Sequence, residues 1–408
     1  MALDWISRDG KLILGARIIR TFSYGFLSVV LAIYLSILGF NEILIGIVLT
    51  ATLVNSIIFN LVSSMYADRI GRRKFLVLYA SLMIVSAVIF FVTNNYLALI
   101  VAALVGTVNV TGSEVGAFLS LEQAILPQTI RDEKKRTSAF AIYNMLGTFA
   151  MSGGVLVSGL PHIFSQQFGL DKITSIKMLF VAYAACALVS LIIYLALSSK
   201  IESASKSQKT VMPHQSLSPK SRSIITKMSS LFAVDSFAGG FVIQSIVSFW
   251  FYTKFGADLS TISYIFTAAG IFTALSYLLA SKIASRVGLV NTMVWTHIPS
   301  NILLILVAFA PSFPLAIVLY LARMSISQMD VPTRQSYLMA VVAENERVAA
   351  AGITNTSRNI AQAVGPSLAG AILGQLLSAP FVIGGVLKIA YDVGLFLSFR
   401  KIKPPEEL

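Results

Sequence analysis

The residues most able to do chemistry in this sequence are charged side chains that stand inside long apolar segments. Glu114 and Asp330 lie close to the middle of two such segments. A charge at the centre of a lipid bilayer costs several kcal/mol and is kept mainly where it binds a ligand, an ion or a partner. We therefore expect Glu114 and Asp330 to bind a proton or a ligand. The other charged residues inside apolar segments are Arg17, Arg20, Glu122, Asp235, Arg323, Arg334, Arg358, Lys388 and Asp392.

The composition indicates that lipid surrounds these segments. The 408 residues are 56% hydrophobic and only 12% charged, with a mean hydropathy of +0.80. A membrane-spanning helix needs about 20 apolar residues, and about twelve runs of that kind occupy nearly the whole chain. This pattern predicts an all-α integral membrane protein without room for a soluble catalytic domain, and so not an enzyme. The approximate centres of the runs are Tyr24, Ser56, Ile84, Gly112, Phe149, Leu188, Phe241, Phe272, Pro299, Gln328, Ala361 and Ala390.

Basic residues predict the orientation, because short loops rich in Lys and Arg stay in the cytoplasm. Among the 31 basic residues, we assign only Lys172, Lys177 and Lys254 to the outer side. Both termini and the central loop are therefore expected in the cytoplasm, in a multi-pass protein of the cell membrane. This bias accounts for the net charge of +13, so nucleic acid is not an expected partner.

The two halves of the chain resemble each other. The polar, Ser-rich stretch 199–228 reads as a cytoplasmic linker between bundles 1–198 and 229–408. Ser64–Gly71 aligns with Ser281–Gly288, and at nearly the same separation Gly25 aligns with Gly240. Arg136, Asn144, Gly154 and Gly159 align in the same order with Arg347, Asn355, Gly365 and Gly370. Such a repeat is typical of transporters that contain two related halves.

A short polar loop carries a family resemblance. Asp68-Arg69-Ile70-Gly71-Arg72-Arg73, with the preceding Ala67, resembles the loop signature of the major facilitator superfamily, although Ser64 stands where that family usually has glycine. The resemblance implies twelve transmembrane helices in two pseudo-symmetric six-helix bundles, and a transporter. It further implies a conformational latch, made of Asp68, Arg69, Gly71, Arg72 and Arg73, in which Asp68 pairs with Arg72 and with the start of helix 11. The alternative is a solvated basic loop that only sets topology.

Two further patterns of the family's drug:proton antiporters are degraded. Val108 stands where those proteins commonly carry an arginine in helix 4, and Gly147-Thr148 lacks the proline of their helix 5. The resemblance is therefore to the superfamily, with an antiporter assignment weakened by these departures.

In the family that this chain resembles, helices 1, 4, 7 and 10 line a central cavity, and they carry most of the buried charges. Besides Glu114 and Asp330, the polar residues expected to contact substrate there are Tyr24, Asn109, Gln244, Gln328 and Arg323. Arg20 aligns with Asp235 and Glu122 aligns with Arg334, so these residues are expected to pair across the pseudo-two-fold axis as a cytoplasmic gate. Lys388 and Asp392, four residues apart, are expected to pair along one helix.

Glu114 is the first candidate for proton coupling because no basic residue lies one turn away, whereas Asp330 has Arg334 four residues on. The alternative for Glu114 is a structural acid hydrogen-bonded near Asn109 or Ser113. His297, beside Pro299, reads as a structural histidine in a kinked helix.

The sequence therefore predicts a secondary active transporter that moves a small organic solute by alternating access, as proton-coupled efflux. An uncoupled facilitator or importer on the same fold is an alternative, and a non-transporting membrane sensor is another. The expected partners are a small-molecule substrate, protons and the lipid bilayer, and the expected state is a monomer. The single Cys186 and the lack of ligand spacing predict no metal, and no cofactor motif is present.

Overall fold

In the computed structural model the chain is helical throughout the part that it describes. The described residues are 5–113, 116–130, 136–199, 201–202, 218–342 and 346–402, and within them the only strand-like pairing is a single bridge between Ile6 and Ile130. Among these residues nine helices are long and apolar enough to cross a membrane, and two shorter helices are also apolar. The all-α membrane fold expected from composition is confirmed.

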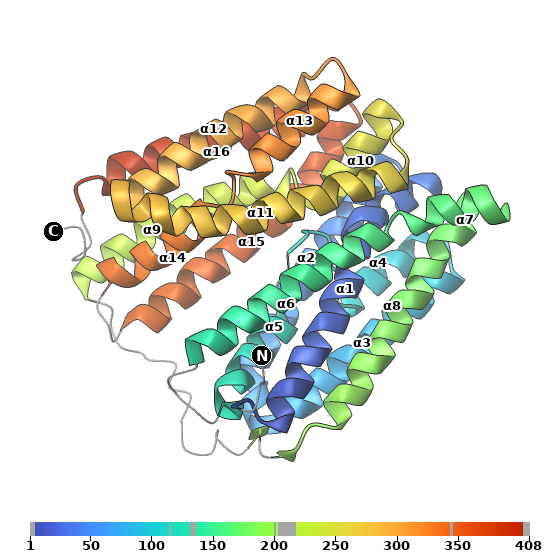
Figure 1. Cartoon of the computed structure of the whole chain (residues 1–408), viewed down its shortest axis with the longest axis horizontal. Coiled ribbons are helices and arrows are strands. Elements are labelled where there is room, and N and C mark those ends of the chain that lie inside the picture. The colour runs from blue at the N-terminus through green and yellow to red at the C-terminus, as the bar shows by residue number, and fades with distance from the viewer. Residues whose placement is uncertain are drawn as a thin grey trace. The chain divides into compact units, whose positions relative to one another are not determined.

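The helices follow the predicted apolar runs in order (Figure 1). The first half contains α1 (Arg8–Ile37), α2 (Glu42–Ile70), α3 (Arg72–Val92), α4 (Tyr96–Val105), α5 (Ala117–Ile125), the 3-10 helix η1 (Leu126–Thr129), α6 (Arg136–Val157), α7 (Leu160–Phe168) and α8 (Lys172–Leu195). The second half contains α9 (Pro219–Gly240), α10 (Gln244–Phe255), α11 (Leu259–Val287), α12 (Leu289–Ala308), α13 (Phe313–Met324), α14 (Asp330–Val341), α15 (Arg347–Leu373) and α16 (Ala379–Phe399).

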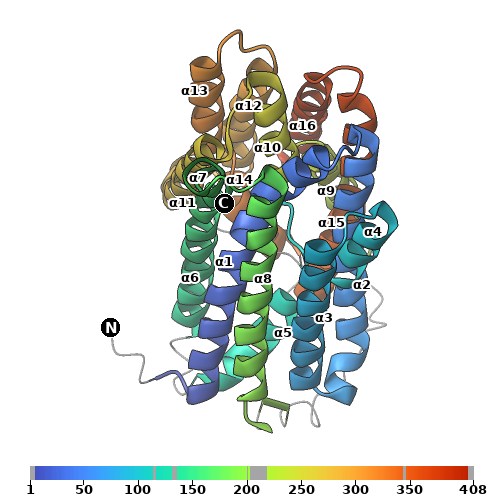
Figure 2. The same ribbon diagram turned by 90° about the vertical axis from the view of Figure 1, so that its right-hand side faces the viewer.

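The chain forms two compact units. Unit 1 comprises Met1–Asn41, Ile47–Val211 and Val247–Tyr264, and unit 2 comprises Glu42–Gly46, Met212–Ile246 and Ile265–Leu408. In unit 1, α1 packs against α6 and α8, and α3 packs against α8 (Figure 2). In unit 2, α9 packs against α15 and α16, and α12 packs against α13, α14 and α16.

Equivalent glycines bring equivalent helices together in the two units. A Cβ on Gly154 of α6 would overlap the backbone of Phe22 in α1, and a Cβ on Gly25 would overlap the backbone of α6 at Met151. The same relation holds between Gly240 of α9 and Gly365 of α15. Small residues let helix backbones approach closely in a membrane. The positions that the sequence repeat aligned therefore occupy matching helix crossings.

Several expected helices are interrupted. The helix expected around Gly112 is divided into α4 and α5, because the described residues between them, 106–113 and 116, are not helical. Gly112 and Gly116 have φ of 77° and 109°, which favour glycine, and Asn109 Oδ1 accepts hydrogen bonds from the N–H groups of Thr111 and Gly112. The helix expected around Gln328 is similarly divided at residues 325–329.

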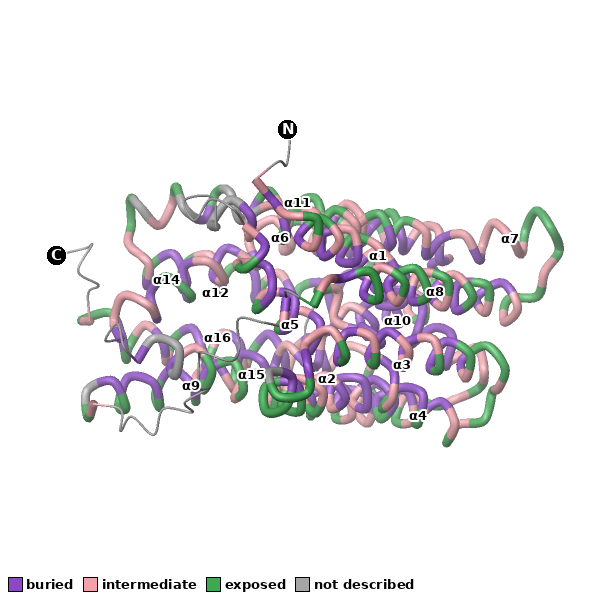
Figure 3. The backbone as a smooth tube through the Cα atoms, turned by 90° about the horizontal axis from the view of Figure 1, so that it is seen from below, coloured by how far each residue is buried: buried purple, intermediate pink, exposed green. Residues whose placement is uncertain are grey.

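The outer surface of the helices is apolar. Large hydrophobic side chains such as Val92, Leu97, Phe149, Val318 and Leu397 are each more than 60% exposed. Buried and exposed residues alternate along individual helices, as α3 and α8 show in Figure 3. A water-soluble protein rarely exposes so much apolar surface, whereas lipid is a suitable solvent for it.

Candidate functional site

Unit 1 contains a fully buried ion pair between α1 and α5. Both side chains, Arg20 and Glu122, are 0% exposed. Arg20 Nη1 and Nη2 donate to Glu122 Oε1 and Oε2 at 2.8 and 2.9 Å, a bidentate arrangement. Tyr194 of α8 and Tyr143 of α6 donate to the same two carboxylate oxygens at 2.6 and 2.7 Å.

This arrangement leaves Glu122 little capacity for further bonds. Each oxygen of a carboxylate offers about two acceptor sites, and each oxygen of Glu122 already accepts two hydrogen bonds. Arg17 lies close by, with its guanidinium carbon 3.7 Å from the centre of the Tyr143 ring and its Nε donating to Tyr143 O at 2.9 Å. Arg20, Glu122 and the two tyrosines therefore join four helices, and the Glu122 carboxylate is not open to a ligand.

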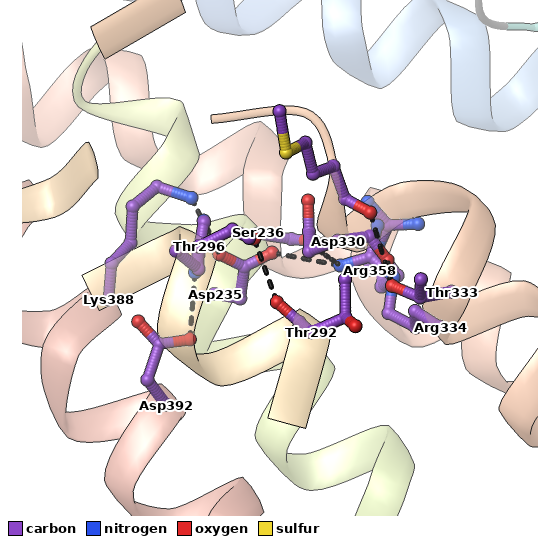
Figure 4. A network of polar contacts seen from close by, with 12 residues as sticks. Asp235, Ser236, Thr292, Thr296, Asp330, Thr333, Arg334, Arg358, Lys388 and Asp392 are labelled. Carbon is purple, nitrogen blue, oxygen red and sulfur yellow. Dashed lines mark hydrogen bonds and ion pairs between the residues drawn. The ribbon is translucent and has the colours of Figure 1, made fainter. Parts of the chain in front are cut away.

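Unit 2 contains a larger buried network, which is centred on Asp235 of α9 (Figure 4). Lys388 Nζ of α16 donates to Asp235 Oδ1 at 2.6 Å. Arg334 Nη1 of α14 lies 3.3 Å from Asp235 Oδ2 and 3.1 Å from Asp330 Oδ2. Arg358 of α15 lies beside this group and donates through Nε to Ser236 Oγ at 3.1 Å. Four helices thus place three cations around two carboxylates.

A histidine connects this network to a third carboxylate. Nδ1 of His297 lies 2.8 Å from Asp392 Oδ1, and Nε2 of the same ring lies 4.0 Å from Asp235 Oδ1. Asn301, one turn along α12, donates to Asp392 Oδ2 at 3.1 Å. The imidazole therefore stands between two buried acids, one on α16 and one on α9.

The two networks occupy repeat-related positions with opposite signs. The acid of the α9–α14 pair, Asp235, aligns with Arg20, and its base, Arg334, aligns with Glu122 to within a residue. The cross-axis pairing that the sequence predicts for a cytoplasmic gate stays a prediction, and the structure pairs each acid with a base of its own unit. In unit 1 the reason is the pair of tyrosines that complete the bonds of Glu122.

The expected pair between Lys388 and Asp392 is also replaced by bonds to other helices. Lys388 binds Asp235 on α9, and Asp392 binds His297 and Asn301 on α12. An aspartate side chain is short, and it is satisfied here by groups that face it directly across the helix interface. His297 consequently belongs to an ionic network, a position that its sequence context did not indicate.

The predicted cavity residues fall in different places. Tyr24 and Asn109 line one hollow in unit 1, where Tyr24 donates to Thr107 Oγ1 at 3.0 Å. Most of the bonds of Asn109 are made within its own loop, including one from Nδ2 to Ser113 O at 2.6 Å. In unit 2, Gln244 begins α10, Gln328 lies between α13 and α14, and Arg323 lies near the end of α13. Glu114 lies outside the described residues.

The latch residues lie where α2 meets α3. Gly71 forms the sharp turn with φ of 121°. Arg72 Nη1 donates to Ala124 O in α5 at 3.1 Å, and Arg73 donates to Leu195 O at the end of α8. Arg69 is exposed in the last turn of α2, and the Asp68 side chain lies outside the described part. The pairing of Asp68 with Arg72 and the latch role stay predictions.

Two serines, one before and one after the segment that joins the halves, are each bound by a carboxylate in the same way. Asp9 accepts bonds from the backbone N–H and hydroxyl of Ser198, at 3.0 and 2.5 Å. Glu346 accepts the equivalent two bonds from Ser218, at 2.6 and 3.2 Å. These bonds from Ser218 hold the pKa of Glu346 below its usual value. Ser218 also caps α9, which begins at Pro219, within the stretch expected as linker.

The comparisons with known proteins agree with this arrangement. The family model of the Major Facilitator Superfamily matches residues 13–254 and 228–408. The chain belongs to the Major Facilitator Superfamily. The chain is also similar to the Saccharomyces cerevisiae membrane protein YJR124C. The two are 27% identical over 423 residues, which cover 96% of this chain and 94% of the yeast protein.

Solved structures of the superfamily share the fold. The nucleoside transporter NupG superposes with a TM-score of 0.76 at 14% identity, over 96% of this chain and 99% of NupG. A D-xylose–proton symporter superposes with a TM-score of 0.73 at 13% identity, over 98% of both chains. Membership of this superfamily confirms a multi-pass membrane transporter, and leaves substrate, direction and coupling to be argued from the residues.

Proposed function

We propose that the protein is a proton-coupled secondary transporter that exports a small organic solute by alternating access. It would act at the cell membrane as a monomer, with both termini in the cytoplasm. The observation that carries the proposal is the buried network of unit 2, in which His297 lies between Asp392 and Asp235. Such a cluster supplies a place where a proton can be taken up and released inside the membrane.

The charge balance of the network favours this role. The network holds three carboxylates, Asp235, Asp330 and Asp392, and three cations, Lys388, Arg334 and Arg358. A fourth buried cation, Arg323 of α13, interacts electrostatically with Asp235. A proton on His297 therefore adds one net positive charge to a buried cluster. Unpaired buried charge is costly, so uptake of the proton favours rearrangement of the ion pairs around it. A bistable set of ion pairs is what alternating access requires.

Glu114, which the sequence places in the helix 4 run, is the alternative proton site predicted from sequence. Three alternatives concern the function itself. An uncoupled facilitator would use the same fold without any proton site, an importer would move solute inward, and a membrane sensor would bind its ligand without flux. Proton coupling on this fold has a precedent in the structurally similar D-xylose–proton symporter. Export is the direction predicted from sequence; the loop motif resembles that of the superfamily as a whole and does not by itself set a direction.

The test is transport in proteoliposomes with an imposed pH gradient. The solute can be chosen by its stabilisation of the purified protein, because a ligand that binds the folded state raises its melting temperature. We expect solute movement to be accompanied by counter-movement of protons in the wild-type protein. We expect His297→Gln to fold and bind solute but to lose proton movement.

Matched variants make the result decisive. His162→Gln removes the partly buried imidazole near Asp258 in unit 1 and should leave proton movement unchanged. If Glu114→Gln abolishes proton movement while His297→Gln does not, the proton site is Glu114. Solute flux without proton movement in the wild type indicates a facilitator, flux in the same direction as protons indicates an importer, and binding without flux indicates a sensor.

A further inference from the structure

The interruption between α4 and α5 borders a hollow in unit 1. Its empty space is about 360 Å³ including its open mouth, and about one water-sized group fits in it as it stands. The walls come from α1, α2, residues 107–111 and 116, and the start of α5. The residues that line it and carry the argument are Tyr24, Asn55, Ser56, Phe59, Thr107 and Phe118.

Asn55, which lines this hollow, has an unused hydrogen-bond acceptor. Its side chain is 1% exposed, and its Nδ2 donates to Leu104 O at the end of α4. Within the part of the chain that the structure describes, Asn55 Oδ1 is buried without a hydrogen-bond partner. A buried acceptor left unsatisfied costs about 1–3 kcal/mol. The cost is removed when a ligand donor reaches this oxygen.

The start of α5 supplies donors to the same space. The first N–H groups of a helix have no partner inside it, and Gly116, which caps α5, has no side chain to accept from them. Gly116 has φ of 109° and ψ of −163°, a conformation that only glycine adopts readily. Gly116 and Ala117 both line the hollow. The site therefore combines a side-chain acceptor with backbone donors.

This combination selects the ligand chemistry. A hydroxyl group is the smallest group that both donates to Asn55 Oδ1 and accepts from a backbone N–H. The described lining residues include no Asp, Glu, Lys or Arg. An anion would lie against the unpartnered oxygen of Asn55, and a cation would lie against the positive end of α5. The rings of Phe59 and Phe118 offer an apolar wall to the rest of the solute.

We propose that this hollow binds an uncharged solute through one of its hydroxyl groups, which donates to Asn55 Oδ1 and accepts from the start of α5. This inference rests on the proposed function, and under that function the bound solute is the one that is transported. Residues 107–111 and 116, between α4 and α5, are then part of the binding site, and not only a bend in the helix. Asn55 determines specificity because it distinguishes a hydroxyl from the corresponding ether.

The test measures binding to the full-length purified protein by ligand-dependent thermal stabilisation. The probes are hydroxylated ring compounds: a pentose, a hexose, inositol and a ribonucleoside, each also in its fully O-methylated form. A hexuronate and a hexosamine supply the anionic and cationic versions of one ring. We expect at least one uncharged hydroxyl compound to bind, its O-methylated form to bind weakly, and the charged rings not to bind.

Variants at Asn55 decide the role of the oxygen. Asn55→Leu keeps the size of the side chain and removes the acceptor, so we expect about tenfold weaker binding, the loss of one hydrogen bond. Asn60→Leu on the same helix, outside the hollow, should bind as the wild type does. Far-ultraviolet circular dichroism of both variants checks that each retains its helices.

Several outcomes overturn the proposal. Equal binding of the O-methylated compound, preference for a charged ring, no binding by any uncharged probe, or unchanged affinity in Asn55→Leu each contradicts it. Failure of the proposed function is separately visible. If the wild type binds a hydroxyl compound through Asn55 and shows no flux in proteoliposomes, the site is real and the protein is a sensor.

Discussion

Glu122 shows how one side chain can be buried and charged without being available for chemistry. Four hydrogen bonds from Arg20, Tyr143 and Tyr194 meet its two oxygens. Sequence reasoning identified Glu122 and Arg20 as charged residues with a shared purpose. It expected them to pair across the pseudo-two-fold axis, because any acid and base at suitable depth satisfy charge complementarity, and that gate pairing stays a prediction. The structure gives both residues a partner within unit 1. The deciding tyrosines lie on α6 and α8, far away in the sequence, and tyrosine is too common in membrane proteins to serve as a signal.

The first prediction concerns the stability of that joint. Glu122→Leu should destabilise the protein by about 3–5 kcal/mol, because it leaves the Arg20 guanidinium buried without its carboxylate. The double variant Arg20→Met with Glu122→Leu should be clearly more stable than Glu122→Leu alone, since no unpaired charge remains. Chemical denaturation in detergent measures both. Tyr143→Phe, which removes one hydrogen bond, is the control and should cost about 1 kcal/mol.

A double variant that is no more stable than Glu122→Leu would contradict this prediction. It would mean that the loss of stability does not come from the unpaired Arg20 guanidinium. Transport by the double variant gives a second reading. If it transports at the wild-type rate, Arg20 and Glu122 are not a gate.

The second prediction concerns Glu346 and Ser218. The two hydrogen bonds from Ser218 lower the pKa of Glu346 in the folded state relative to the unfolded value of about 4.3. The stabilisation is therefore complete above the unfolded pKa and is lost as the pH falls through and below it. Melting temperatures from pH 7 to pH 3 should fall less steeply for Glu346→Gln than for the wild type.

Ser218→Ala provides the control for this measurement, because it removes the hydroxyl bond and keeps the backbone N–H bond to Glu346. Its pH dependence should lie between those of the wild type and Glu346→Gln. Parallel melting curves for all three proteins would show that Glu346 titrates alike in the folded and unfolded states.

At the scale of helices, sequence predicts where the apolar runs lie better than whether they are continuous. Hydropathy averages over about 20 residues, so the positions of α2, α12 and α15 follow directly from it. The interruption at 106–116 lies within one run and is invisible to that average. Its local signals were present: Asn109, Thr111 and Gly112 favour a turn, and Gly106 and Gly116 flank it.

The same limit explains why the hollow at Asn55 was not predicted. One asparagine in an apolar helix is an ordinary packing residue by sequence alone. It becomes a candidate ligand contact only because the neighbouring helix is interrupted there and its Oδ1 has no partner within the described residues. Glycines and asparagines inside an apolar run are therefore better interpreted as signals of a helix interruption than as unfavourable residues within a continuous helix.

At the scale of the whole molecule, duplication preserved helix packing while the charges diverged. Gly25 and Gly154 in unit 1 correspond to Gly240 and Gly365 in unit 2, and each pair marks a close helix crossing. The ion pairs at the aligned positions kept their location and reversed their signs. Unit 2 added Lys388, His297 and Asp392 to its pair. Helix packing therefore constrains both units alike, whereas proton exchange is proposed for unit 2 only.

The third prediction follows from that equivalence. Gly154→Ala places a methyl group against the Phe22 backbone, and Gly365→Ala places one against Gly240; neither backbone can turn aside as a side chain can. Each variant should lose about 3 kcal/mol or more, which exceeds the gain of about 1 kcal/mol from replacing glycine in a helix.

Gly153→Ala and Gly352→Ala are the matched controls. The nearest atom to a Cβ on Gly153 is in the Phe22 ring at 3.8 Å, and nothing lies within 4 Å of one on Gly352. Both controls should be as stable as the wild type or slightly more so. Thermal unfolding in detergent measures all four, and a large loss in only one of the two crossing variants would show that the halves no longer share their packing.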